Sequence, residues 1–98
     1  MAQFDVYRMA DGELVLDVQT DLLGSFDSRV VVPLMPPADA PTRHPRLNPE
    51  VAVEGERYVM VTQFMIALDR AELRDRVANL DSQYDQIKLA YDMLFNGF

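Results

Sequence analysis

Residues 3–20 read QFDVYRMADGELVLDVQT and predict the first structural unit of the chain, a β-hairpin. Apolar and polar side chains alternate in both halves, which is the period of two expected of a strand with one buried face. Asp11 and Gly12 stand between the halves, and this dipeptide favours a two-residue hairpin turn, in which both central residues need a positive φ. We therefore expect an antiparallel pair over residues 2–20. The alternating apolar residues are Phe4 and Val6 before the turn and Leu14, Leu16 and Val18 after it.

The composition limits what the chain can be. Its 98 residues are 49% hydrophobic, which suits one globular domain over residues 1–98. The absence of cysteine excludes a disulfide scaffold and a thiolate metal site, and with a single histidine we expect no metal centre and no cofactor. The formal net charge of −7 argues against direct nucleic-acid binding, which depends on clustered Lys and Arg. The N-terminus lacks a signal-peptide pattern, and the apolar runs are far shorter than the ~18 residues of a membrane span, so we expect no membrane association and a cytoplasmic location.

Further β-branched runs predict three more strands, separated by a proline-rich loop. The predicted strands cover residues 29–34, 50–54 and 57–66, with a tight turn at Gly55 and Glu56. Pro33 lacks a backbone donor, which restricts it to an edge, a strand end or a bulge. Residues 35–49 hold five of the six prolines, so we expect a long surface loop that is either functional or mobile.

The last third of the chain predicts a C-terminal helix after an ambiguous segment. Residues 69–80 fit a helix by their apolar spacing, or short irregular and strand-like pieces carrying apolar anchors, and both alternatives stay open. Residues 81–95 predict a helix, with Asp81 or Ser82 as its N-cap and Gly97 as a left-handed residue just past its end. The helical apolar stripe consists of Tyr84, Ile87, Tyr91 and Leu94, widened by Ala90.

These elements predict an α+β fold: a small antiparallel sheet or barrel with a C-terminal helix. The sequence has no glycine-rich phosphate loop, and His44, in the proline-rich loop, is interpreted as a loop residue rather than a catalyst. A ribonuclease can work with an arginine that stabilises phosphorane charge and a carboxylate base. Residues of these types could meet across the sheet, although no spacing singles them out. They are Asp17, Arg29, Arg57 and Thr62.

The end of the chain carries apolar residues that do not belong to the helical stripe. Met93, Phe95 and Phe98 either pack on the helix's own domain or form an interface with a second molecule. A helix that is apolar on more than one side needs a second surface to bury against. We favour the interface, and the small size of the domain makes a homodimer plausible.

Five segments, in order over almost the whole chain, resemble the CcdB family of toxins from toxin–antitoxin modules. They are QFDVY, LVLDVQTDLL, RVVVPL, LNPEVAVEGERYVMVTQFM and the ending LF-x-GF. The resemblance implies a small antiparallel barrel-like domain with a C-terminal helix, forming a symmetric homodimer. It further implies a protein that is not an enzyme, but binds the cleavage-core subunit of DNA gyrase, a topoisomerase II, and traps the covalent enzyme–DNA complex.

The family's gyrase-binding residues are the last three, Trp-Gly-Ile, and the matching positions here are Asn96, Gly97 and Phe98. Gly97 is kept, Phe98 keeps an apolar terminus, and Asn96 departs from the pattern. A tryptophan could stack on an arginine of the target, a contact worth roughly 0.5–2 kcal/mol, whereas asparagine cannot.

The departure at Asn96 leaves three possible functions: gyrase poisoning with altered contacts, a different topoisomerase target, or a non-toxic relative that still binds the antitoxin. A MazF-like endoribonuclease is the remaining alternative, because mRNA-cleaving toxins share a related barrel fold.

The resemblance also implies a CcdA-type antitoxin whose disordered C-terminal tail folds on binding the toxin. In the family, basic residues near the first hairpin help to hold an acidic tail. Here that hairpin keeps only Arg8. With a net charge of −7, we expect an antitoxin tail that is less acidic than usual or relies on apolar anchors.

Overall fold

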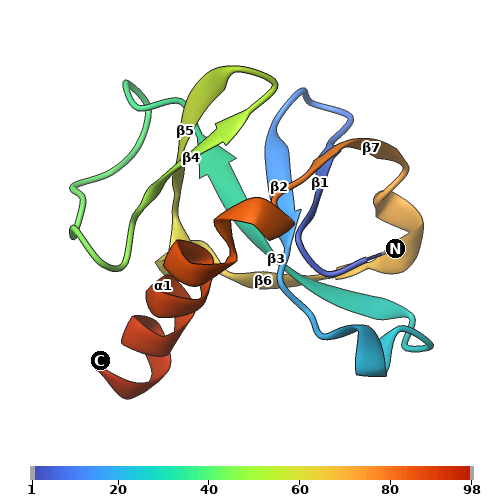
Figure 1. Ribbon diagram of the computed structural model, residues 1–98. Helices are drawn as coiled ribbons and strands as arrows, with labels where there is room; N and C mark the ends of the chain where they lie inside the picture. Colours follow the sequence, from blue (N-terminus) through green and yellow to red (C-terminus); the bar gives the residue numbers. More distant parts are fainter. Residues whose placement is uncertain (1, 98) are drawn as a thin grey trace.

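Seven strands and one α-helix make up the part of the chain that the computed structural model describes, residues 2–97 (Figure 1). The strands pair antiparallel in the order β4-β5-β3-β2-β1-β7, and β6 pairs with part of β3. The predicted α+β class is confirmed: the sheet curls into a half-barrel, and the helix follows it. The elements are β1 (Asp5–Arg8), β2 (Leu14–Asp17), β3 (Ser28–Met35), β4 (Glu50–Val53), β5 (Glu56–Met60), β6 (Ile66–Asp69), β7 (Asp75–Asn79) and α1 (Tyr84–Asn96).

The first predicted hairpin is confirmed, but its turn differs from the prediction. β1 pairs with β2, and Met9 N–H donates to the Glu13 carbonyl at 2.7 Å, which leaves a three-residue loop between them. Gly12 has a φ of 89°, while Asp11 keeps a negative φ and its carboxylate accepts from Glu13 N–H. The Asp-Gly pair thus supplies a turn stabilised by its own side chain and ended by one left-handed glycine.

The two-residue turn with positive φ at both positions occurs instead in the second hairpin. Glu54 and Gly55, with φ of 51° and 82°, join β4 to β5. The turn therefore lies one residue earlier than the predicted Gly55–Glu56. Because glycine carries no Cβ penalty at positive φ, it takes the second turn position and lets the strands continue on both sides.

The single long strand predicted over residues 57–66 is interrupted. β5 ends at Met60, a 3₁₀ turn spans Thr62–Phe64, and β6 begins at Ile66. Both parts pair with the same edge of β3, and the break lies opposite Pro33, whose carbonyl accepts from Val61 N–H at 3.0 Å. Since proline has no N–H to return the bond, the ladder cannot run through this point. Pro33 was predicted at an edge, a strand end or a bulge, but it lies inside β3, which pairs regularly with β2 on its other side. The gap between β5 and β6 accommodates its missing donor instead.

The ambiguous segment 69–80 is not helical, so its strand-like alternative is correct. A 3₁₀ turn, Arg70–Glu72, is capped by the Asp69 carboxylate, and β7 follows and pairs with β1. Leu73 and Leu80, only 5% and 3% exposed, anchor the two ends of the segment. The helical spacing of the apolar residues was misleading here because pairing with the free edge of β1 satisfies the backbone.

Helix α1 begins three residues later than predicted, after a 3₁₀ turn over Asp81–Gln83. Neither Asp81 nor Ser82 caps α1. Its N-cap, Gln83, makes no capping bond because its side-chain amide exchanges two hydrogen bonds with the backbone of Ala52 on β4, at 3.0 and 3.1 Å. This amide covers the open edge of β4 as a neighbouring strand would. At the other end, the prediction for Gly97 is confirmed, with a φ of 77° and its N–H donating to the Met93 carbonyl.

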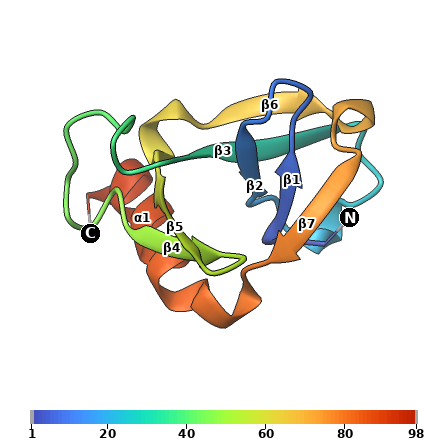
Figure 2. The same ribbon diagram turned by 90° about the horizontal axis from the view of Figure 1, so that it is seen from above.

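The curled sheet buries side chains on both of its faces. The larger core lies between the sheet and α1, which contributes Ile87 and Ala90, both fully buried. A smaller core fills the ring formed by β6, β3, β2, β1 and β7, which Figure 2 shows from above. Its apolar members are Tyr7, Val15, Val31 and Leu73. Because each face of the sheet is covered by one of these cores, almost every side chain of β1 and β2 is buried, and exposure does not alternate along these strands.

Candidate functional site

The last residues of α1 are exposed. The Phe95 side chain is 67% exposed, and Asn96 and Gly97 are also exposed, while Met93 is only half-buried. In Figure 1 this end of the helix points away from the sheet. The third predicted gyrase-binding residue, Phe98, lies outside the described residues. The last helical turn therefore offers apolar and polar groups to another molecule.

A shallow apolar hollow of about 510 Å³ lies beside this helix end. Phe95 and Tyr91 of α1 form one wall, and Val18, Val30 and Met65 contribute from the sheet side. Burial of Tyr91 raises the pKa of its hydroxyl above the ordinary value. The predicted interface residue Phe95 thus lines a surface with contributions from several elements, and Met93 precedes it in the same helix.

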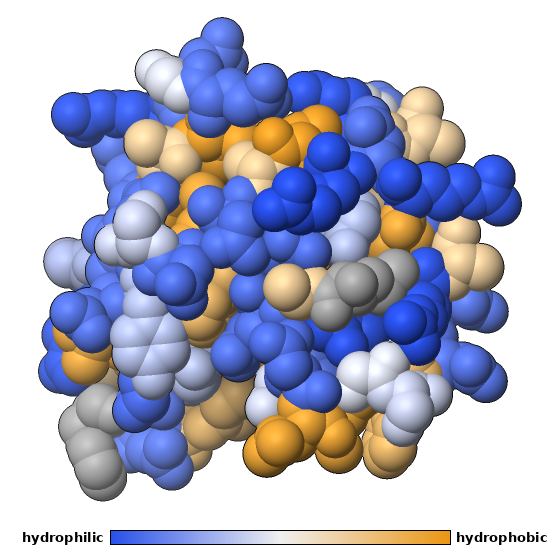
Figure 3. All heavy atoms as spheres, turned by 45° about the vertical axis from the view of Figure 1, so that its right-hand side comes forward, coloured by the Kyte–Doolittle hydropathy of each residue, from blue (hydrophilic) through white to orange (hydrophobic). Residues whose placement is uncertain are grey.

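A second exposed apolar group follows β2, and it was not among the candidates that the sequence suggested. Leu22, Leu23 and Phe26 are 91%, 40% and 53% exposed. Figure 3 shows orange, apolar atoms gathered at the lower edge of the visible face. Two adjacent leucines in an otherwise polar turn were the available indication, since such a turn has no core to receive both.

The residues considered for ribonuclease chemistry do not assemble into an accessible site. Arg29 donates through Nε and Nη2 to Oδ2 of Asp17, at 2.8 and 2.7 Å, and both side chains are fully buried in the ring. Burial raises the pKa of the Asp17 carboxyl, and the hydrogen bond from Arg29 opposes this effect. Thr62 is buried and donates to the Leu47 carbonyl, whereas Arg57 is 80% exposed and pairs with Glu50.

A second carboxylate of the ring is held by neighbours from β7. Asp5 is 2% exposed and accepts from Asn79 Nδ2 at 2.9 Å and Arg76 Nε at 2.8 Å. Burial by itself would raise the pKa of Asp5, but the hydrogen bonds from Asn79 and Arg76 together lower it below its usual value. Asp5 therefore stays ionised and ties β1 to β7, a structural role.

The other two sequence candidates also have defined surroundings. Arg8 ends β1, its side chain is 43% exposed, and it forms a 3.6 Å ion pair with Glu54 in the turn between β4 and β5. His44 accepts at Nδ1 from the backbone N–H groups of Arg46 and Leu47, at 3.2 and 3.3 Å. His44 is therefore a residue that shapes the proline-rich loop, in agreement with its interpretation as a loop residue.

The described residues contain neither a candidate metal centre nor a candidate membrane helix. Within residues 2–97, no three His, Asp or Glu side chains stand close enough to hold a metal ion. Over the same residues, the helices are too short or too polar to cross a lipid bilayer.

Comparison with solved structures identifies the fold as that of the small half-barrel proteins with a C-terminal helix. A structure described as "Endoribonuclease from Mycobacterial species" superimposes with a TM-score of 0.73, at 19% sequence identity, over 95% of this chain and 88% of that one. The chain belongs to the CcdB family, because the sequence model of the CcdB protein matches residues 3–97. It is accordingly the toxin of a toxin–antitoxin module, and its family partner is an antitoxin.

Proposed function

We propose that this toxin acts in the cytoplasm as a homodimer that poisons DNA gyrase by trapping the covalent enzyme–DNA complex. The contact with the cleavage-core subunit is made by the chain end, Asn96, Gly97 and Phe98. The observation that carries the proposal is the exposed last turn of α1 in a chain of the CcdB family. In this mode the protein is not an enzyme: it stabilises an intermediate that gyrase itself forms.

The chemistry of the helix end suits a cationic group on the target. The last carbonyl groups of α1 carry the negative end of the helix dipole, and the Asn96 side chain adds another hydrogen-bond acceptor. A guanidinium can use both. Because Gly97 is left-handed, the backbone leaves the helical path after Asn96.

The dimer is supported by the apolar hollow beside α1. A two-fold interface uses the same patch on both protomers, so Phe95 of one copy can enter the hollow of the other. Together with Met93, this contact would hide apolar surface that the single chain exposes, and it would place the two helix ends near the symmetry axis. Two copies of residues 96–98 would then face the target together.

The dimer is tested by replacing Phe95 with aspartate. We expect the F95D variant to be folded and monomeric by analytical ultracentrifugation at concentrations where the wild type is a dimer. Leu89→Asp is the matched control, because Leu89 is also on α1 and 51% exposed, but does not line the hollow. A dimeric F95D variant, or a control that dissociates equally, would remove Phe95 from the interface.

The gyrase proposal is tested with purified protein, gyrase and supercoiled plasmid. We expect linear DNA to appear after denaturation of the trapped complex, in an amount that rises with toxin concentration. In parallel, inducible expression without the antitoxin should stop bacterial growth. A protein that causes no growth defect and traps no gyrase would instead be a non-toxic relative that retains antitoxin binding.

Endoribonuclease activity is the second candidate, favoured by the fold shared with the mycobacterial endoribonuclease. The likeness at 19% identity concerns the fold, and Asp17 and Arg29 are sealed inside the ring. The same preparation should be incubated with RNA. Cleavage of RNA without any trapped gyrase complex would replace the gyrase proposal by this one.

A further inference from the structure

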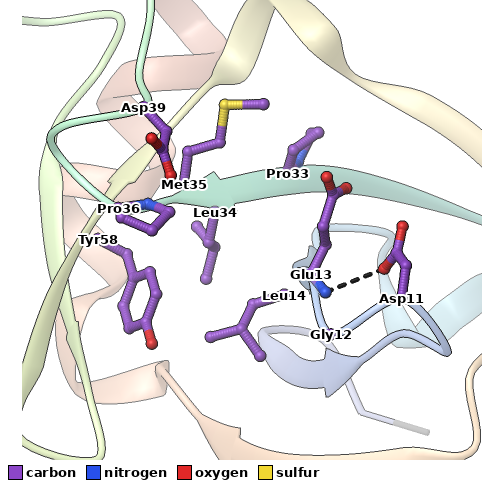
Figure 4. Close-up of a pocket in the computed structure, with 10 residues that line it drawn as sticks. All are labelled: Asp11, Gly12, Glu13, Leu14, Pro33, Leu34, Met35, Pro36, Asp39 and Tyr58. Atoms are coloured by element: carbon purple, nitrogen blue, oxygen red, sulfur yellow. Dashed lines mark hydrogen bonds between the residues drawn. The ribbon is translucent and has the colours of Figure 1, made fainter.

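A groove of about 350 Å³ lies on the side of the half-barrel where the β1–β2 loop approaches the end of β3 (Figure 4). Leu14 and Leu34 form its floor, and each is only 3% exposed. Pro36 and the ring of Tyr58, from β5, line the opposite wall in Figure 4. The groove is therefore lined by three separate segments of the chain, with apolar groups at its floor and on one wall.

The rim of this groove is acidic. Asp11 and Glu13 stand at the β1–β2 loop, and Asp39 stands across the groove beside Pro36 (Figure 4). None of the three carboxylates forms an ion pair with a cation among the described residues 2–97. Arg8, at the end of β1, is already paired with Glu54. The groove thus combines an apolar floor with uncompensated negative charge, in a protein whose net charge is −7.

The arrangement of these carboxylates favours a guanidinium over a metal ion. They do not converge tightly enough to coordinate a metal ion, since the described part of the chain has no such group of three. A guanidinium is larger, carries a delocalised charge and donates in several directions. It can also lie on an aromatic face, and the Tyr58 ring is oriented by its hydroxyl, which donates to Glu56 at 3.3 Å.

We propose that this groove receives an arginine side chain, flanked by apolar residues, from the C-terminal tail of the antitoxin. The guanidinium lies among Glu13, Asp39 and Tyr58, and the neighbouring apolar residue covers Leu14 and Leu34. This occupant has a charge opposite to that of the acidic tail implied by the family resemblance. The proposal needs the antitoxin partnership of the family but does not depend on the gyrase target.

Charge-matched peptides test the chemistry of the groove. Three capped peptides, acetyl-Gly-Leu-Xaa-Pro-Gly-amide with Xaa as arginine, citrulline or glutamate, are titrated into isotopically labelled toxin and followed by NMR. We expect amide shifts at residues 11–14, 39 and 58 with the arginine peptide. The isosteric, uncharged citrulline peptide should bind about three- to tenfold more weakly, as expected for two exposed charge contacts and a ring contact. The glutamate peptide should bind most weakly.

Neutral variants separate the rim charges from the general acidity of the protein. The double variant Glu13→Gln, Asp39→Asn should lose the preference for arginine over citrulline. Glu72→Gln with Asp85→Asn removes two acids that are also exposed but lie elsewhere, and this variant should keep the preference. Neither Glu13 nor Asp39 makes a side-chain hydrogen bond in the described structure, so both double variants are expected to fold. Equal binding of the three peptides, or shifts outside the groove, would overturn the proposal.

A competition identifies the natural occupant. The arginine peptide should shift the groove amides of free toxin but not those of the purified toxin–antitoxin complex. Peptide binding that persists in the complex would exclude the antitoxin tail from the groove. The groove double variant should also trap gyrase as well as the wild type. Loss of trapping in a folded variant would assign the groove to the target instead of the antitoxin.

Discussion

The interior of the strand ring and the end of α1 both carry residues that the sequence suggested as candidates, and their surroundings are opposite. In the ring, Asp17 and Arg29 are fully buried and bonded to each other. The backbone of Gln19 adds a hydrogen bond to each of them, while Nη1 of Arg29 has no partner among the described residues. At the end of α1, Asn96 and Phe95 are exposed, and no hydrogen bond ties the Asn96 side chain to the described residues.

This difference separates a structural role in the ring from the functional role proposed for the helix end. An arginine and a carboxylate with all their contacts inside the fold hold β2 and β3 together and cannot reach a substrate. Exposed groups that are held on a rigid helix but lack internal partners remain available to another molecule. The two regions therefore predict two kinds of mutational effect, one on stability and one on activity alone.

The largest expected effect is on the interior. Arg29→Met leaves the Asp17 carboxylate buried without its partner, and we expect the free energy of unfolding to fall by about 3–5 kcal/mol. Urea denaturation followed by circular dichroism measures this change. Arg57→Met is the control, because Arg57 is 80% exposed, and its loss should leave the midpoint almost unchanged.

The double variant Asp17→Leu, Arg29→Met removes both charges and shows whether the pair itself is needed. We expect it to recover most of the lost stability, since replacing a buried ion pair by apolar groups is often close to neutral. If Arg29→Met alone were as stable as the wild type, the pair would not hold the ring together, and the contrast with the helix end would fail.

The next effect concerns the exposed region. Removal of residues 96–98 should weaken gyrase trapping by about thirtyfold or more, which corresponds to the loss of a hot spot of about 2 kcal/mol. The free energy of unfolding should hardly change, because Asn96 and Gly97 are exposed and their removal breaks only hydrogen bonds of the last helical turn. The two measurements are plasmid linearisation by gyrase and urea denaturation of the same preparation. Full trapping by the truncated chain would move the contact to another surface.

The elements that the sequence predicted correctly depend on local patterns. The hairpin of β1 and β2 follows from alternation, although its register, with Val6 opposite Leu16, was set by a three-residue loop that was not predicted. The end of α1 follows from Gly97. β7 was ambiguous because its strand conformation depends on pairing with β1, at the other end of the chain. The break at Thr62–Phe64 was missed because it follows from Pro33, a residue of a different strand. Interactions between distant segments thus decided the elements that local spacing could not.

The candidate sites follow the same rule. The family resemblance pointed to Asn96 and Gly97, and the structure adds the exposure of the helix end. The burial of Asp17 with Arg29 was not predictable, because charged residues are usually exposed and neither residue indicates its partner. The groove was not predictable either, since Glu13 and Asp39 line the same hollow only after the sheet has curled.

The smallest expected effect is a gain, and it tests why Asn96 departs from the family pattern. Asn96→Trp adds an aromatic face at an exposed position where no described neighbour restricts it. If an arginine of gyrase lies opposite, the contact is worth about 0.5–2 kcal/mol, so half-maximal trapping should need about two- to thirtyfold less toxin. Asn96→Leu is the matched control, because leucine adds apolar area without an aromatic face.

A gain with tryptophan alone would mean that the chain retains the target geometry of the family and has a weaker contact at one residue. Equal gains with both would assign the effect to apolar area, and no gain with either would mean that residue 96 meets a different surface, as expected for a changed topoisomerase target.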